Sequence, residues 1–138
     1  MTDTITRTAP APQVWPTLQA RDARALIDFY VRVFGFVENV VHGDGDTVHH
    51  AQLDWPEGGG LMLGSHKPGA AWSREPGTFG GYVVTDRVDE VWARVRDAHG
   101  VTVVHALEDT DYGSRELAVA DPEGNLWSFG SYRGEPRR

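Results

Sequence analysis

Two stretches of the chain carry apolar residues at the spacing of an amphipathic helix. In residues 22–35 the apolar stripe consists of Leu26, Ile27, Tyr30, Val33 and Phe34. Asp22 stands where a side chain can accept from the first helical amides, and Gly35 can adopt the left-handed conformation that ends a helix. Residues 86–100 repeat the design, with Asp86 as the cap, Gly100 as the stop and a stripe of Val88, Val91, Trp92 and Val95. The pattern predicts helices over 22–35 and 86–100.

Short β-rich segments surround the two predicted helices in the same order. An extended segment precedes each helix, at 13–20 and 79–85, and three strands follow each, the last after a Pro-Glu-Gly turn. The helix caps lie 64 residues apart (86 − 22), and the two turns lie 66 apart (122 − 56). Caps, stops and turns that coincide at a nearly constant offset indicate an internal duplication. We therefore predict an α+β fold of two βαβββ modules, with mixed sheets that curl around a cleft.

The duplication also sets the expected domain organisation. The first module spans 13–64 and the second spans 79–132, with a linker at 65–78 that is rich in proline and glycine. We expect the polar ends of the chain, 1–12 and 133–138, to be flexible tails.

Composition narrows the classes of function. The chain has 138 residues, is 40% apolar and carries a net charge of −7, which argues against a nucleic-acid partner. No apolar run approaches the roughly 20 residues that span a membrane. The absence of cysteine excludes a disulfide framework and thiolate ligands, and the first residues lack the apolar region of a secretory signal. These features predict a cytoplasmic protein without a membrane or nucleic-acid partner.

Strand alternation assigns each side chain either to the face that a helix covers or to the opposite, concave face. Leu61 and Leu63 are the natural helix-side residues of their strand, so Met62 points to the concave face. The same counting gives a concave lining of Trp15, Thr17, Gln19, His50, Gln52, Met62, Gly80, Tyr82, Glu116 and Ser128. Because consecutive strand residues diverge, His49 is expected on the other face, and His49 and His50 are not a chelating pair.

Aromatic and apolar walls with a few polar groups are typical of a pocket for an organic ligand. Tyr112, at a turn before the seventh strand, could cover the cleft, and packing on the surface is the alternative. Arg115 could meet an anionic ligand, and pairing with neighbouring strands is the alternative. Buried Trp and Met residues are also common in cores, so a structural or regulatory dimer with a collapsed cleft stays open.

The repeated modules, with "DARALIDFYVRVFGF" in the first and "DYGSRELAVADPEGNLWSFGSY" ending the second, resemble the vicinal oxygen chelate superfamily. This superfamily contains glyoxalase I, extradiol dioxygenases, fosfomycin resistance proteins and bleomycin-binding proteins. The resemblance covers about residues 13–132, and the terminal motif is most similar to the glyoxalase/bleomycin-resistance branch. It implies eight strands around a cleft, and a homodimer in which modules of both chains can build each site.

The resemblance also implies where a metal ion would bind. Metal-dependent members place a His or Gln on the first strand of a module and a Glu on its last, and the matching positions are Trp15, Met62, Gly80 and Ser128. A shift by one from Gly80 to Phe79 changes nothing. Trp and Gly side chains offer no lone pair, Met suits soft ions, and a neutral hydroxyl binds weakly without carboxylates. We therefore expect no metal ligands at these positions and no cofactor.

Two functions remain. The first is metal-independent binding of a hydrophobic or aromatic small molecule in the cleft between the modules, as in sequestration of an antibiotic or a toxic metabolite. The alternative is a glyoxalase-like lyase, isomerase or dioxygenase that uses a divalent metal at a non-standard site or His50 and Glu116 as an acid–base pair. Those two residues occupy equivalent strand positions, and hydrogen-bonding groups of a wet cleft or an ordinary ion pair are the simpler interpretation.

Overall fold

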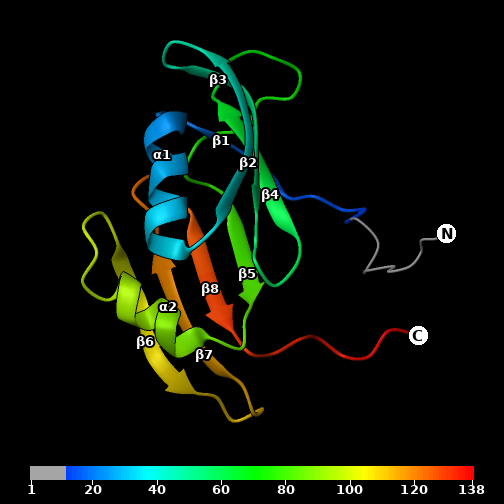
Figure 1. Ribbon diagram of the computed structural model, residues 1–138, viewed down its shortest axis with the longest axis vertical. Helices are drawn as coiled ribbons and strands as arrows, with labels where there is room; N and C mark the ends of the chain where they lie inside the picture. Colours follow the sequence, from blue (N-terminus) through cyan, green and yellow to red (C-terminus); the bar gives the residue numbers. More distant parts are fainter. Residues whose placement is uncertain (1–11) are drawn as a thin grey trace, which may run out of the picture.

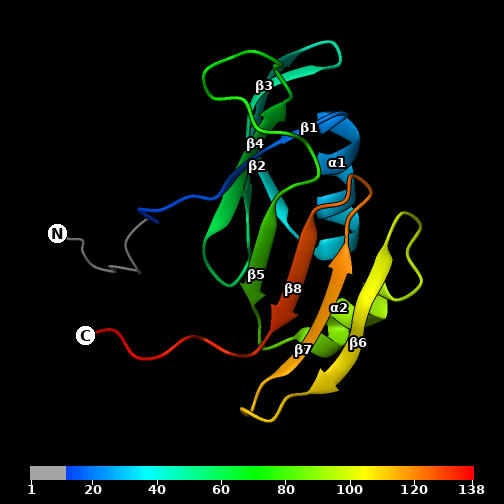
Figure 2. The same ribbon diagram turned by 180° about the vertical axis from the view of Figure 1, so that it is seen from behind.

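The structure is a computed structural model that describes residues 12–138 (Figures 1 and 2). Its strands are β1 (Thr17–Ala20), β2 (Val37–Asp44), β3 (Thr47–Asp54), β4 (Gly60–Ser65), β5 (Gly80–Val84), β6 (Thr102–Asp109), β7 (Arg115–Ala120) and β8 (Leu126–Gly130). Its helices are α1 (Ala23–Phe29), the π-helical turn η1 (Tyr30–Phe34) and α2 (Val88–Val95). Most of the expected N-terminal tail lies outside the described residues.

The strands form two four-stranded sheets with the same topology. Their orders are β1-β4-β3-β2 and β5-β8-β7-β6. In each sheet the first and last strands of the module pair in parallel, and the other pairs are antiparallel. The predicted βαβββ duplication is therefore confirmed. Figure 1 shows α1 and α2 on the same side of the molecule, each against its own sheet. Within residues 12–138, none of the helices is both long and apolar enough to cross a membrane.

The first helix begins and ends where the sequence predicts. The carboxylate of Asp22 accepts a hydrogen bond from the amide of Ala25 at 3.1 Å, and Gly35 ends the helical segment with a φ of 99°. Its last five residues form the wider turn η1, because the amides of Gly35 and Phe36 both donate to the carbonyl of Tyr30. The wider turn leaves Tyr30 fully buried.

The second helix is shorter than predicted, and Asp86 is not its cap. It covers Val88–Val95. Arg87 stands at the cap position, and its amide donates a hydrogen bond to the hydroxyl of Thr85 at 2.9 Å. The Asp86 carboxylate binds the guanidinium of Arg133 at 2.7 Å. A cation in reach therefore draws Asp86 away from the helix. Gly100, with a φ of 89°, lies in the turn before β6 and does not end the helix.

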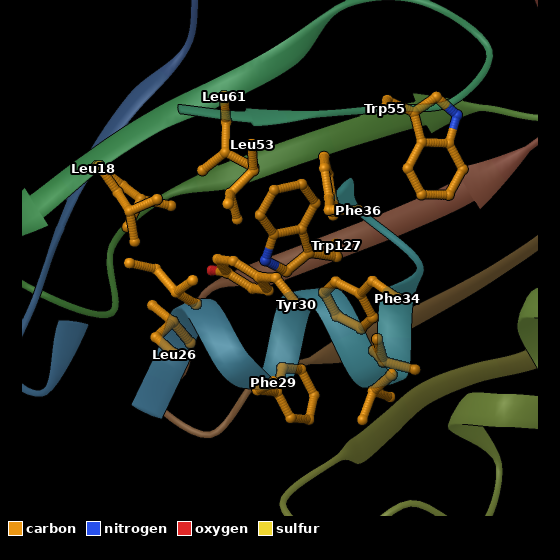
Figure 3. Packing of buried hydrophobic residues seen from close by; sticks show 14 of the residues in the cluster. Leu18, Leu26, Phe29, Tyr30, Phe34, Phe36, Leu53, Trp55, Leu61 and Trp127 are labelled. Carbon is orange, nitrogen blue, oxygen red and sulfur yellow. The ribbon is translucent and has the colours of Figure 1, made fainter. Parts of the chain in front are cut away.

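The two modules share one core, in which the second sheet packs against the helical segment of the first module (Figure 3). The ring of Trp127, on β8, lies 5.3 Å from that of Tyr30 and 5.6 Å from that of Phe34. Phe129 lies 4.9 Å from Phe34. Trp127 and Phe129 are buried on the helix side, as predicted, and several of the rings that they meet belong to the other module.

Reciprocal hydrogen bonds join the two Pro-Glu-Gly turns to the opposite helices. Glu57, in the turn of the first module, accepts the amide of Asp86 at 2.9 Å, just before α2. Glu123, in the turn of the second module, accepts the amide of Asp22 at 2.9 Å, just before α1. Each turn thus holds the start of its partner module's helix, which explains why the turn is written twice. These bonds fix the relative position of the two sheets.

Candidate ligand-binding site

A linker hollow and a seam hollow lie along the junction of the modules, and a further hollow lies on the first sheet beside the linker. The linker hollow, of about 410 Å³, lies between β1, the linker and the start of β5, and its lining includes Thr17, Gln19, Trp72, Arg74, Phe79 and Gly80. The seam hollow, of about 410 Å³, lies beside the turn before β4 and along β5, and its lining includes Phe36, Trp55, Phe79, Gly80, Tyr82 and Trp127. The first-sheet hollow, of about 370 Å³, lies on the outer face of the first sheet, and its lining includes Thr17, Gln19, His50, Met62, Lys67 and Arg74.

Aromatic side chains form part of the wall of the seam hollow. Five rings border it, those of Phe36, Trp55, Phe79, Tyr82 and Trp127. Of these five residues, the sequence predicts only Tyr82 to contact a ligand. Strand alternation assigns a residue such as Trp127 to the face that a helix covers. The junction with the other module opens that face to a hollow, and nothing in the strand pattern of one module signals it.

Gly80 lies where the linker hollow and the seam hollow meet. A Cβ atom at Gly80 would meet a single neighbouring atom, the carbonyl oxygen of Leu126 at 4.0 Å. The φ of Gly80 is outside the left-handed region, so other residues can adopt its backbone conformation. The glycine therefore leaves open a space that a side chain can fill without strain.

Gln19 holds the linker across the edge of the first sheet. Its side-chain amide donates to the carbonyl of Trp72 at 3.1 Å, and its side-chain oxygen accepts the amide of Arg74 at 3.2 Å. A hydroxyl–imidazole contact of 3.3 Å between Ser73 and His66 ties the same segment a second time. The indole of Trp72 is 74% exposed and borders both the linker hollow and the first-sheet hollow. The predicted ligand residue Gln19 thus positions the linker.

The first-sheet hollow brings together Thr17, His50 and Met62, which the sequence assigned to the concave lining. The expectation for His49 is wrong. Opposite His42 and Gly43, the ladder shifts so that His42 faces His50 and Gly43 faces Val48, which leaves His49 as the extra residue of a β-bulge. His49 consequently borders the same hollow as His50.

Two other predicted lining residues of the first module lie outside these hollows. Trp15 precedes β1, is half-buried and has its ring beside Gly60. Gln52 donates to Asp54 at 2.8 Å on the outer face of β3. The predicted first strand begins only at Thr17, because Pro16 has no amide to donate to a ladder.

On the second sheet, Glu116 is bound by two tyrosines. The hydroxyl of Tyr82 donates to its carboxylate at 2.7 Å, and that of Tyr112 donates at 2.6 Å. Partial burial favours a higher pKa for Glu116, but the hydrogen bonds from Tyr112 and Tyr82 hold its pKa below the ordinary value. Burial and the adjacent Glu116 carboxylate raise the pKa of Tyr82. Within residues 12–138, no hydrogen bond or ion pair joins Glu116 to His50.

Ser128 and Arg115 lie on opposite faces of the second sheet. Ser128 lies on the outer face with Tyr82, and its hydroxyl donates to the carbonyl of Leu117 at 3.2 Å. Arg115 binds Asp89 at 2.8 Å and Asp109 at 2.9 Å. Since Asp89 belongs to α2, the guanidinium lies on the helix-covered face, and the hypothesis that it meets a ligand in the cleft is corrected.

The sequence matches a known family model over residues 13–129, that of the Glyoxalase/Bleomycin resistance protein/Dioxygenase superfamily. The chain belongs to this superfamily. Its curated relatives include the uncharacterized protein Rv0887c of Mycobacterium tuberculosis, which is 38% identical over 128 residues, a match covering 86% of this chain and 74% of that protein. The resemblance found in the terminal motif is therefore confirmed.

Solved structures with a similar fold include TioX and the antibiotic binding protein TnmS3. TioX from Micromonospora sp. ML1 is 29% identical with a TM-score of 0.67, covering 85% of this chain and 97% of that one. TnmS3, an antibiotic binding protein from Streptomyces sp. CB03234, is 25% identical with a TM-score of 0.64, covering 89% and 97%.

The positions that match the superfamily's metal ligands do not fit a divalent ion. Trp15 and Gly80 have no donor atom for a metal, and Met62 has only a thioether. The Ser128 hydroxyl donates to the carbonyl of Leu117, and within residues 12–138 no carboxylate is hydrogen-bonded to any of these four residues. Across residues 12–138, no group of three or more His, Asp or Glu side chains is arranged to hold a metal ion. We derive no chemistry through a metal at these positions.

Proposed function

We propose that the protein binds an aromatic small molecule without a metal, in the connected hollows along the junction of the modules. The observation that carries this proposal is the meeting of two hollows of about 410 Å³ at Gly80, one of them bordered by five aromatic rings. A hollow of this size with aromatic groups in its wall suits a drug-sized ligand. Each aromatic contact contributes about 0.5–1.5 kcal/mol beyond the burial of area.

Sequestration of an antibiotic or a toxic metabolite is the biological form of this proposal. Superfamily membership supports it, as does the likeness to TnmS3, an antibiotic binding protein. A ligand that is held and released unchanged needs shape and stacking, and needs no reactive group.

We further propose that the protein works as a homodimer. The outer face of the second sheet exposes 43% of Tyr82 and 55% of Leu126, and the neighbouring Tyr112 is 59% exposed. A second copy would remove this apolar surface from water. Light scattering on the purified protein gives the mass directly, and a monomer at all concentrations would contradict the dimer.

Filling the space at Gly80 tests the location of the ligand. Polycyclic aromatic antibiotics are titrated into the protein while Trp fluorescence is followed, because Trp55, Trp72 and Trp127 border the hollows. Gly80→Leu should weaken binding about tenfold or more, since the side chain occupies the shared space. The matched control is Ala106→Leu, which introduces the same side chain at an exposed position of β6.

Two outcomes would overturn the proposal. One is an unchanged fluorescence signal across the panel, and the other is equal binding by the Gly80→Leu and Ala106→Leu variants. Elemental analysis of protein purified without chelator distinguishes metal-independent binding from the metal-dependent enzyme alternative. A stoichiometric metal that is lost in His50→Ala or Glu116→Ala would favour the enzyme.

A further inference from the structure

Lys67 and Arg74 differ from the arginines elsewhere between residues 12 and 136 in that their charged groups are unpaired. Every other arginine in that range pairs with a carboxylate or donates to a backbone carbonyl. Among the residues that the structure describes, the charged groups of Lys67 and Arg74 have no hydrogen bond or ion pair. Both residues lie on the linker, and both border the first-sheet hollow.

The first-sheet hollow combines this unpaired positive charge with an apolar floor. The side chain of Met62 supplies apolar surface, and Trp72 supplies an exposed ring at the edge. His49 and His50 add two imidazoles that can donate hydrogen bonds. No Asp or Glu is among the lining residues of this hollow, although the whole chain has a net charge of −7.

The position of Arg74 is fixed by its backbone. Its amide donates to the side-chain oxygen of Gln19, and the carbonyl of Trp72 accepts from the same side chain. The guanidinium therefore projects from an anchored segment, which lowers the ordering cost of binding. Arg74 also borders the linker hollow, where Glu75 is the one carboxylate in the lining. A guanidinium so placed can bind a carboxylate with two parallel hydrogen bonds.

We propose that the ligand is an aromatic acid, with its ring system beside Trp72 and Gly80 and its anionic group bound by Lys67 and Arg74. This inference rests on the proposed function and names the chemical class of the ligand. The two unpaired cations discriminate between an acid and a neutral molecule of the same shape, because only the acid neutralises them.

Matched pairs of probes test the inference. Binding of 2-naphthoate and anthracene-2-carboxylate is compared with that of the corresponding carboxamides at neutral pH, by quenching of Trp fluorescence and by calorimetry. The acids should bind about tenfold tighter than the amides. In a Lys67→Gln/Arg74→Gln double variant, the affinity of the acids should fall to that of the amides, whose affinity stays unchanged. The control Arg87→Gln/Arg96→Gln removes two charges at exposed positions of the α2 region and should keep the preference.

The outcomes separate this inference from the function on which it rests. Equal binding of acids and amides, or loss of the preference in the control variant as well, overturns the inference alone. A Gly80→Leu variant that binds both probe classes normally contradicts the proposed location of the ring. Failure of all four probes to bind the wild-type protein overturns both proposals.

Discussion

Trp55 and Asp121 occupy the same position in the two Pro-Glu-Gly turns, 66 residues apart (121 − 55). Both are buried, at 8% and 4% exposure. Trp55 packs its ring 5.0 Å from that of Phe36 and donates its indole N–H to the carbonyl of Val84 at 3.1 Å. Asp121 is instead a buried acceptor at the centre of a hydrogen-bonded group. The equivalent positions of the two turns thus hold a packed indole in one module and a buried hydrogen-bond acceptor in the other.

The group around Asp121 consists of three side chains that donate to one carboxylate oxygen. The hydroxyl of Tyr30 donates at 2.5 Å, the amide of Asn125 at 3.0 Å and the indole of Trp127 at 3.1 Å. Burial and the adjacent Asp121 raise the pKa of Tyr30 above its ordinary value, so Tyr30 keeps its proton. The comparison shows that the duplicated backbone turn tolerates either a ring or a carboxylate at this position, provided that its polar groups are satisfied.

The largest effect is expected at this pair of positions. Asp121→Ala leaves the buried donors of Tyr30, Asn125 and Trp127 without an acceptor and should lower the free energy of unfolding by about 3–5 kcal/mol. Trp55→Phe keeps a ring and removes one hydrogen bond, so the loss should be about 1–2 kcal/mol. Urea-induced unfolding measures both.

Tyr30→Phe provides a second measurement if the Asp121→Ala variant does not fold. It removes one of the three donors and should cost about 1–2 kcal/mol. A cost for Asp121→Ala no greater than that of Trp55→Phe would show that the carboxylate is not the centre of this network.

A smaller effect is expected at the turn glutamates. The side chain of Glu123 is 10% exposed, whereas Glu57 is an exposed residue. Charge-assisted hydrogen bonds to amides strengthen as water is excluded. Glu123→Gln should therefore cost about 1–2 kcal/mol of unfolding free energy and Glu57→Gln less than about 1 kcal/mol. Equal costs would mean that burial does not separate the two turns.

The smallest effect is a dependence on pH at the third pair of equivalent positions, His50 and Glu116. The folded state holds the pKa of Glu116 below its ordinary value, so the bonds from Tyr82 and Tyr112 favour folding at neutral pH. This contribution is lost as the pH falls through the ordinary carboxyl range toward the folded pKa. A Tyr82→Phe/Tyr112→Phe variant should be less stable than the wild type at neutral pH, with a difference that shrinks in acid. A constant difference would contradict this assignment.

Structural features that are set by a few neighbouring residues could be predicted from the sequence. The Asp22 cap, the Gly35 stop and the alternation around Met62 each depend on a few neighbouring residues, and all three are present. The start of the second helix was predicted too early, because the Asp86 carboxylate binds Arg133, which is distant in sequence, and does not cap the helix.

The candidate site depended on contacts that strand patterns do not encode. Alternation brought Thr17, His50 and Met62 together correctly, yet the bulge at His49 shifts one residue onto the outer face. The opening of the seam hollow depends on how the modules meet. That Arg74 is unpaired can be recognised only from the structure, by comparison with the other arginines between residues 12 and 136, each of which has a partner.

The crossed bonds of Glu57 and Glu123 have the form of a two-fold interface within one chain. A half-length ancestor with a single such turn could have paired with its twin through the same two bonds. Fusion of two such halves would make that association independent of concentration, because the covalent connection supplies a high local concentration of the second half. Each half could then specialise its outer face, and in this chain one carries imidazoles and the other a tyrosine-bound carboxylate.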